Sequence, residues 1–246
     1  MPLPLADRIA LVTGASRGIG HAAALALAKA GAHVVAVART VGGLEELDDA
    51  IRALGGSATL VPLDLKDYDG IDRLGLALHE RFGRLDVLVG NAGILGPLSP
   101  LGHVEAKAWD EVMATNVTAN WRLIAALDQL LKFSDAGRVV FISSDVTALA
   151  LAYWGPYATS KAALETLART YAAETATTNV RVNVFTPGPV RTRLRAQAMP
   201  GEDPMTLVTA DKVAEKIVEL CLPSMQESGK LYAYQKGKLL DFRPPS

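Results

Sequence analysis

The chain has 246 residues, of which 50% are hydrophobic and 21% charged, with a formal net charge of -1. This composition is typical of a soluble globular protein, and the balanced charge argues against nucleic acid or an anionic membrane surface as a partner. One cysteine, no signal-peptide pattern, no membrane-length apolar run and no metal-spaced histidine pair lead us to expect a cytoplasmic protein without disulfide, membrane span or metal.

Short apolar runs alternate with helix-forming runs along the chain. Six or seven strands are expected, at Ile9–Thr13, His33–Ala38, Ala58–Leu63, Leu85–Val89, Arg138–Ser144, Val180–Phe185 and Lys230–Tyr234. Helices are expected at His21–Ala30, Leu44–Leu54, Asp67–Arg81, Trp109–Lys132, Tyr157–Thr178 and Asp211–Leu222. This alternation indicates a parallel sheet with helices on both faces, and right-handed crossovers make it doubly wound. We therefore predict a single α/β domain of Rossmann type over residues 1–246.

A glycine-rich turn follows the first expected strand. It reads Gly14-Ala15-Ser16-Arg17-Gly18-Ile19-Gly20 and leads directly into a helix. Between a strand and a helix, such glycines predict a dinucleotide phosphate site. They let the backbone approach the pyrophosphate, and the helix N-terminus offers free N–H groups. The alternative is a turn made only for packing, and the flanking strand and helix count against it.

Tyr157 and Lys161 lie four residues apart at the start of an alanine-rich helix. Residues at this spacing share one helix face, with Cβ atoms roughly 5–6 Å apart. A cation beside the phenol favours the phenolate and lowers the tyrosine pKa from about 10, so we expect Tyr157 to exchange a proton near neutral pH. The alternative is an ordinary solvated pair on a helix surface.

Together, the turn from Thr13 to Gly20 and the pair Tyr157 and Lys161 resemble the classical short-chain dehydrogenases/reductases, over the chain from Arg8 to about Leu194. The resemblance implies an oxidoreductase that reduces a carbonyl or oxidises a secondary alcohol by hydride transfer. It implies that Tyr157 is the acid or base, and that Lys161 lowers the tyrosine pKa and holds the nicotinamide ribose.

Two more catalytic residues follow from the same resemblance. Ser144 lies thirteen residues before Tyr157, which matches the family spacing, and its hydroxyl is expected to polarise the substrate carbonyl. Ser143 is the fallback and is expected to point to the opposite side of the strand. No histidine lies nearby to act as a base, which argues against a hydrolase serine. Asn116 is expected to hold a water beside the lysine.

The choice of cofactor depends on the end of the second expected strand. An enzyme that prefers NAD(H) usually carries an acid there, on the ribose 2′-hydroxyl, but this chain has Ala38 followed by Arg39. A carboxylate would repel a 2′-phosphate, whereas the guanidinium groups of Arg39 and Arg17 can bind it. We therefore expect NADP(H) to be preferred, with NAD(H) still possible.

The resemblance also assigns the remaining cofactor contacts. The complete expected set is Gly14, Ser16, Arg17, Gly18, Ile19, Gly20, Arg39, Asp64, Leu65, Asn91, Ala92, Gly93, Tyr157, Lys161, Pro187, Gly188, Val190 and Thr192. Three residues depart from the family pattern, namely Gly90, Thr186 and Pro189. Gly90 replaces the first asparagine of the family's Asn-Asn-Ala-Gly motif, so a local hydrogen bond is expected to be missing.

Two other classes of function remain open at this point. The same scaffold can host an NAD(P)-dependent isomerase or dehydratase, or a non-catalytic nucleotide-sensing protein. The expected partners are a small carbonyl or alcohol substrate, of hydrophobic character, and a second copy of the chain. The family's helix pairing implies a homodimer or homotetramer, although Gln235–Lys238 replaces the usual glycine-rich ending and puts the tetramer in doubt.

Overall fold

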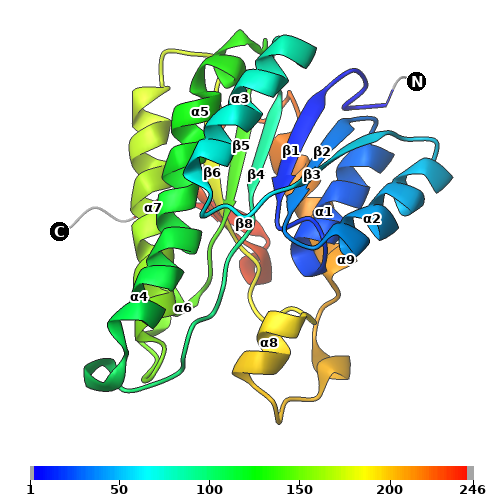
Figure 1. Ribbon diagram of the computed structural model, residues 1–246. Helices are drawn as coiled ribbons and strands as arrows, with labels where there is room; N and C mark the ends of the chain where they lie inside the picture. Colours follow the sequence, from blue (N-terminus) through cyan, green and yellow to red (C-terminus); the bar gives the residue numbers. More distant parts are fainter. Residues whose placement is uncertain (1–2, 243–246) are drawn as a thin grey trace.

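The computed structural model describes residues 3–242, and in these residues one sheet lies between two layers of helices (Figure 1). The strands are β1 (Ile9–Thr13), β2 (His33–Ala38), β3 (Ala58–Pro62), β4 (Val87–Gly90), β5 (Arg138–Ile142), β6 (Arg181–Thr186), β7 (Leu231–Ala233) and β8 (Lys238–Leu240). Their order in space is β3-β2-β1-β4-β5-β6-β7-β8, and every neighbouring pair is parallel except β7 and β8. The strand order changes direction between β1 and β4, so the predicted doubly wound Rossmann-type fold is confirmed.

Helices cover both faces of the sheet. They are α1 (Gly18–Lys29), α2 (Val41–Ala53), α3 (Tyr68–Phe82), α4 (Ala106–Met113), α5 (Ala119–Phe133), α6 (Val146–Leu149), α7 (Gly155–Glu174), α8 (Arg193–Ala198) and α9 (Ala210–Cys221). In Figure 1, α3, α5 and α7 lie on one side of the sheet, and α1, α2 and α9 on the other. Short 3-10 turns lie at Leu101–His103, Pro204–Thr206 and Tyr234–Lys236.

The core consists of two apolar layers separated by the sheet. Along β1, Ala10 and Val12 pack with α1 and α9, whereas Leu11 packs with α3 and α5. This alternation follows from the two-residue period of a strand. Because both faces are covered, the strands are apolar at nearly every position, which is why they are recognisable in the sequence.

The helix expected at Trp109–Lys132 is longer and not uniform. It begins at Ala106, and its middle, Ala114–Thr118, forms a π-helical turn that joins α4 to α5. The Asn116 side chain accepts a hydrogen bond from the Ile94 N–H at 2.9 Å and donates one to the Ile94 carbonyl at 3.0 Å. The amide of Asn120 donates to the Asn116 carbonyl at 2.9 Å. These contacts bind the widened turn to the loop after β4.

The C-terminal end contains a strand that the sequence analysis missed. β7 is shorter than the expected Lys230–Tyr234, and β8 returns antiparallel to it after a turn in which Gly237 has φ +63°. β5 is also shorter, because it ends at Ile142 and leaves Ser143 and Ser144 on the following loop. Both differences come from backbone turns that hydrophobic periodicity does not reveal.

Among residues 3–242, no helix combines the length and apolar character needed to cross a membrane. The same residues include no group of three or more His, Cys, Asp or Glu side chains that could hold a metal ion.

Candidate active site

A pocket of about 430 Å³ opens at the carboxyl ends of the central strands. Its walls include residues of the glycine turn, the ends of β2, β4 and β5, the start of α7 and the segment after β6. All predicted site residues line this pocket except Gly20 and Asn116, which lie behind its wall. The structure therefore brings together residues that are spread over most of the chain.

The glycine turn is tied to β4 through Thr13. The buried Thr13 hydroxyl accepts hydrogen bonds from the N–H groups of Asn91 and Ala92, both at 3.0 Å. The Asn91 amide in turn donates to the Thr13 carbonyl at 2.9 Å. A Cβ on Gly20 would collide with the Asn91 amide and with the Gly14 carbonyl. Gly20 thus permits close packing beneath the turn, while Gly14 lines the pocket itself.

Two predicted residues meet at the far end of the pocket. The Arg39 guanidinium lies 3.8 Å from the Asp64 carboxylate, and both side chains are substantially exposed. The second carboxylate oxygen of Asp64 accepts the Lys66 N–H at 3.0 Å. An exposed ion pair at this distance is worth about 0–1 kcal/mol, so Arg39 remains available to an anionic group.

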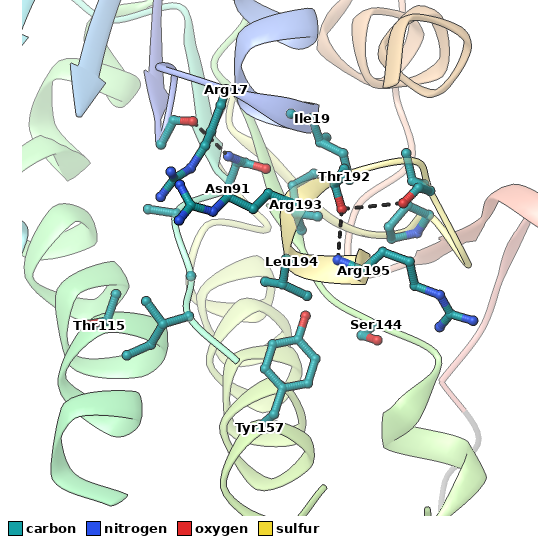
Figure 2. Close-up of a pocket in the computed structure, with 18 of the residues that line it drawn as sticks. Arg17, Ile19, Asn91, Thr115, Ser144, Tyr157, Thr192, Arg193, Leu194 and Arg195 are labelled. Atoms are coloured by element: carbon teal, nitrogen blue, oxygen red, sulfur yellow. Dashed lines mark hydrogen bonds between the residues drawn. The ribbon is translucent and has the colours of Figure 1, made fainter. Parts of the chain in front are cut away.

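Tyr157 and Lys161 lie on the first turns of α7, with both side chains buried. The Lys161 ammonium donates to the Ile142 carbonyl at 2.7 Å and lies 5.7 Å from the centre of the Tyr157 ring. The indole of Trp154 packs edge-on against that ring, with centroids 6.1 Å apart. In Figure 2 the Tyr157 hydroxyl points into the pocket, and Ser144 lies near the hydroxyl end of the Tyr157 ring.

The pKa of Tyr157 differs from the expectation. Burial raises the pKa of this phenol to about 12; the Ser144 hydroxyl lowers it in part, whereas Asp145 raises it further. Burial also lowers the pKa of Lys161 to about 8. The expectation that Lys161 brings the tyrosine pKa below 10 is therefore wrong for this structure. The physical reason is that the phenolate would be desolvated while the ammonium is directed at the Ile142 carbonyl.

The two serines after β5 point in different directions, as predicted. The Ser143 hydroxyl donates to the Glu165 carboxylate at 2.6 Å, away from Tyr157. The Ser144 hydroxyl makes longer contacts, at 3.3 Å with the Asp145 carboxylate and 3.5 Å with the Val146 N–H, and it also acts on the Tyr157 phenol. Asn116 is fully buried and donates to Ser160 at 2.9 Å, and the Ser160 hydroxyl donates to the Tyr157 carbonyl at 2.7 Å. Asn116 therefore supports the backbone at Tyr157.

The segment after β6 closes on itself to form one side of the pocket. Val190 and Val208 form an isolated parallel bridge, and the Arg191 N–H donates to the Val208 carbonyl at 2.9 Å. Between these ends, the Arg195 guanidinium binds both carboxylate oxygens of Glu202 at 2.6 Å. The Thr192 hydroxyl accepts the Arg195 N–H at 3.2 Å and caps α8. We call residues 190–208 the lid.

Several pocket residues were missed by sequence analysis. They are Val146, Trp154, Leu194 and Ala198. Together with Ile94, whose apolar loop favoured a hydrophobic substrate, they give the half of the pocket around Tyr157 an apolar wall. Arg193, on the lid, extends toward the same side of the pocket as Arg17 (Figure 2). In the described part of the chain, neither guanidinium makes a side-chain hydrogen bond or ion pair. The alternating arginines at 191, 193 and 195 were the one available signal, but spacing does not show which of them faces the pocket.

Comparisons with known proteins agree with this geometry. The sequence matches the family model for short chain dehydrogenases over residues 8–203. It is 37% identical to the oxidoreductase YciK of Escherichia coli (strain K12), over 95% of this chain and 94% of that protein. A short-chain dehydrogenase from Shigella flexneri, solved as a complex with NADP, is 36% identical with a TM-score of 0.91, covering 96% of this chain and 100% of that chain.

A second solved structure extends the comparison. It is a short-chain dehydrogenase from Escherichia coli CFT073 complexed with NADPH, 36% identical with a TM-score of 0.89, covering 96% of this chain and 99% of that one. The predicted family is thus confirmed: the chain belongs to the short-chain dehydrogenases/reductases and is an oxidoreductase of that family.

Proposed function

We propose that this enzyme uses NADP(H) to reduce a carbonyl compound or to oxidise the corresponding secondary alcohol. The observation that carries the proposal is the convergence of Tyr157, Lys161 and Ser144 on one pocket that also includes the glycine turn. Two relatives of similar structure were solved with NADP or NADPH. A packing role for the glycine turn would leave that convergence unexplained.

The residues present fit a phosphorylated dinucleotide. Gly14 and Gly18 line the turn, and the guanidinium groups of Arg17, Arg39 and Arg193 line the same pocket. Arginine binds phosphate oxygens with paired N–H groups, and Ala38 leaves no carboxylate to repel a 2′-phosphate. When bound, the cofactor supplies or accepts the hydride. In this proposal Lys161 holds the nicotinamide ribose.

In this proposal Tyr157 transfers the proton. In reduction, its hydroxyl donates a proton to the carbonyl oxygen as that oxygen becomes an alkoxide, and in oxidation the phenolate takes the proton back. Because burial raises the pKa of Tyr157 to about 12, the phenol is protonated at neutral pH, which suits the reductive direction. Ser144 donates a hydrogen bond to the same oxygen, and Asn116 helps to hold the backbone of Tyr157 and the proton path behind it.

The apolar wall around Tyr157 indicates the character of the substrate. Val146, Trp154 and Leu194 would exclude water and bury hydrocarbon beside the reacting carbon. We therefore propose a hydrophobic ketone or aldehyde, or the matching alcohol, as the substrate class.

A screen tests the function. Ketones, aldehydes and secondary alcohols are offered with NADPH, NADH and their oxidised forms, and nicotinamide absorbance is followed together with product. We expect turnover with a hydrophobic carbonyl and NADPH, one cofactor consumed per product. Product without net cofactor change would instead favour an isomerase or dehydratase. NADPH binding without any turnover across the panel would favour a nucleotide sensor.

We also propose that the enzyme is at least a dimer. α5 carries Trp121 and Phe133, with 50% and 59% of their surfaces exposed. An isologous contact of α5 and α7 with a second copy would cover them. Light scattering at micromolar concentration should give twice the chain mass or more, and Trp121→Glu should lower it. A monomer mass in the wild-type protein would contradict the proposal.

A further inference from the structure

α7 carries a third polar side chain in line with its two predicted catalytic groups. Tyr157, Lys161 and Glu165 follow one another at intervals of four residues, so they share one face of the helix. Glu165 is not in the pocket wall, and neither its type nor its position stood out in the sequence. Its place in this row puts a carboxylate one helical turn beyond the active-site lysine.

The carboxylate is held by two hydroxyl groups from the loop after β5. The Ser143 hydroxyl donates to Glu165 Oε1 at 2.6 Å. The Thr147 hydroxyl lies 3.1 Å from the same oxygen and 3.0 Å from the Ser144 carbonyl, so its single proton is shared between two acceptors. Glu165 thus contacts Ser143 and Thr147, on either side of the stretch that contains Ser144.

Lys161 holds the other end of the same loop. Its ammonium donates to the carbonyl of Ile142, the residue just before Ser143. The segment from Ile142 to Thr147 is therefore attached to α7 by Lys161 at Ile142 and by Glu165 at Ser143 and Thr147. Since Ser144 lies between Ser143 and Thr147, the position of its hydroxyl relative to Tyr157 depends on the contacts of Glu165, and Lys161 holds the strand end just before them.

The charges of the two anchors are also coupled. Glu165 acts to raise the pKa of Lys161 against the effect of burial, and Lys161 acts to lower the pKa of Glu165, which burial raises. The other charged groups facing this row are Arg169, which lowers the pKa of Glu165, and Asp145, which acts on Tyr157. Glu165 therefore helps to keep the buried lysine protonated.

We propose that Glu165 is a positioning residue of this enzyme, which fixes the segment from Ser143 to Thr147 so that Ser144 meets the substrate oxygen, and which keeps Lys161 in its cationic form. The inference rests on the proposed function in so far as Ser144 and Lys161 act on substrate and cofactor. It assigns a role to a side chain that touches neither.

Two substitutions separate the geometric part from the electrostatic part. Glu165→Leu removes the hydroxyl contacts, and we expect kcat to fall about tenfold to a hundredfold, as small misplacements of reacting groups do. Glu165→Gln keeps an oxygen that accepts from Ser143 and Thr147, so it should retain most of the rate at pH 7. Glu174→Gln, an exposed carboxylate on the same helix, is the matched control and should behave as wild type.

NADPH affinity tests the effect of Glu165 on the charge of Lys161. It is measured by nicotinamide fluorescence between pH 6 and pH 10. In wild type, affinity should fall as pH rises through about 8, where Lys161 loses its charge. In Glu165→Gln the same fall should occur at lower pH, because the stabilising carboxylate is gone. Circular dichroism on each variant checks that it is folded.

The outcomes distinguish this inference from the proposed function. A pH shift in affinity for Glu165→Gln, in a protein that turns over no carbonyl, would support the charge role and refute the proposed reaction. Wild-type turnover by Glu165→Leu, or an unshifted affinity profile for Glu165→Gln, would overturn the role of Glu165 while leaving the reaction intact. A rate restored by Gln but not by Leu at pH 7 would support the geometric role.

Discussion

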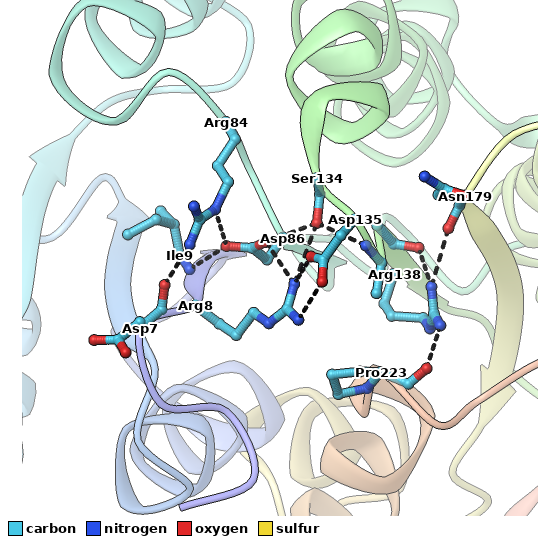
Figure 3. A network of polar contacts seen from close by, with 12 residues as sticks. Asp7, Arg8, Ile9, Arg84, Asp86, Ser134, Asp135, Arg138, Asn179 and Pro223 are labelled. Atoms are coloured by element: carbon cyan, nitrogen blue, oxygen red, sulfur yellow. Dashed lines mark hydrogen bonds and ion pairs between the residues drawn. The ribbon is translucent and has the colours of Figure 1, made fainter.

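The two ends of the sheet handle charge in opposite ways. At the carboxyl ends of the strands, Arg17 and Arg193 face a pocket, and within residues 3–242 neither makes a side-chain polar contact. At the amino ends, a network of arginines and aspartates is almost fully paired (Figure 3). The guanidinium groups of Arg17 and Arg193 therefore face the pocket, while the charged groups at the other end pair with one another.

The paired end is organised around Asp86, which is fully buried just before β4. Its carboxylate accepts from Arg8 at 3.0 Å, from Arg84 at 3.2 Å, from the Ser134 hydroxyl at 2.6 Å and from the Ile9 N–H at 2.8 Å. Arg8 also binds the exposed Asp135. This network joins the segments at the starts of β1 and β4 to the end of α5.

Arg138 shows the same principle with neutral acceptors. Its buried guanidinium donates to the carbonyls of Gly137, Asn179, Leu222 and Pro223 at 2.6–3.1 Å. The contacts connect β5 to the segments before β6 and after α9. The difference suggests a division of roles: the charged residues at the amino ends of this sheet hold its segments together, and in the proposed function the arginines at its carboxyl ends bind the cofactor.

The largest expected effect lies at the unpaired end. Tyr157→Phe keeps the aromatic ring and its packing against Trp154 but removes the transferable proton. Turnover should fall by about 10²–10⁴-fold, the usual contribution of general acid–base catalysis, with little change in NADPH affinity or melting temperature. The measurement is steady-state turnover with a substrate from the screen, alongside a cofactor titration. A variant that keeps most of its turnover would show that Tyr157 is not the acid.

At the paired end, the effect should appear in stability. Asp86→Ala removes the centre of the network and leaves the guanidinium groups of Arg8 and Arg84 without it, so we expect a loss of about 3–5 kcal/mol in the free energy of unfolding. Asp135→Ala, which removes an exposed partner of the same Arg8, should cost less than about 1 kcal/mol. Urea unfolding of both variants makes the comparison. Equal losses would mean that burial is not what distinguishes the two aspartates.

The next effect concerns the choice of cofactor. Wild type should bind NADPH about tenfold or more tightly than NADH, since charged contacts to a phosphate contribute about 1.5–3 kcal/mol each. Arg39→Asp should reverse that order by replacing an attractive group with a repulsive one. Fluorescence titration with both cofactors gives the ratio, and Arg52→Asp, on the exposed part of α2, serves as the control. Equal wild-type affinities would contradict the assignment.

The last effect concerns the stability of the fold and the buried charge of Lys161 at the pocket end. Burial lowers the pKa of this lysine from 10.5 to about 8, so its charge destabilises the fold below pH 8, by about 3.5 kcal/mol at about 1.4 kcal/mol per pKa unit. Lys161→Met also loses the hydrogen bond to Ile142, worth about 1 kcal/mol. We therefore expect the variant to be about 2.5 kcal/mol more stable at pH 7, by the difference of these two figures, and inactive.

The pH dependence checks this sign. Between pH 8 and about 10.5 the lysine becomes neutral in the unfolded chain as well, so the advantage of Lys161→Met should disappear as pH rises. Unfolding curves at pH 7 and near pH 10.5 provide the test. A stabilisation that persists at high pH would point to packing of the methionine instead of relief of a buried charge.

Much of the fold is visible in the sequence, because local patterns determine it. The buried strands are continuous apolar runs, and the glycine turn lies between a strand and a helix, so both were predicted near their observed positions. Most site residues followed from the resemblance to the family and fall on the pocket wall. β8 was missed because it is three residues long and lies beside lysines that resemble a solvated tail.

The missed features all depend on contacts distant in the sequence. The π-helical turn at Ala114–Thr118 is bound to Ile94 by the Asn116 side chain, and no periodicity reports such a contact. The replacement at Gly90 is explained by neighbours on β5 and α5, because a Cβ there would collide with the Phe141 ring and with the Asn120 side-chain oxygen. The pKa of Tyr157 likewise depends on burial, which spacing along a helix does not show.

The lid has a kinetic consequence. Its two ends are joined at Val190 and Val208, and its interior is held by the pair of Arg195 and Glu202, so it is closed on itself and touches the rest of the wall from one side. We expect a segment built in this way to move as one piece about its two ends, with its internal contacts kept. Release of a nucleotide held beneath it would then require one concerted movement, on the microsecond-to-millisecond scale typical of such segments, and that movement would set an upper limit on turnover.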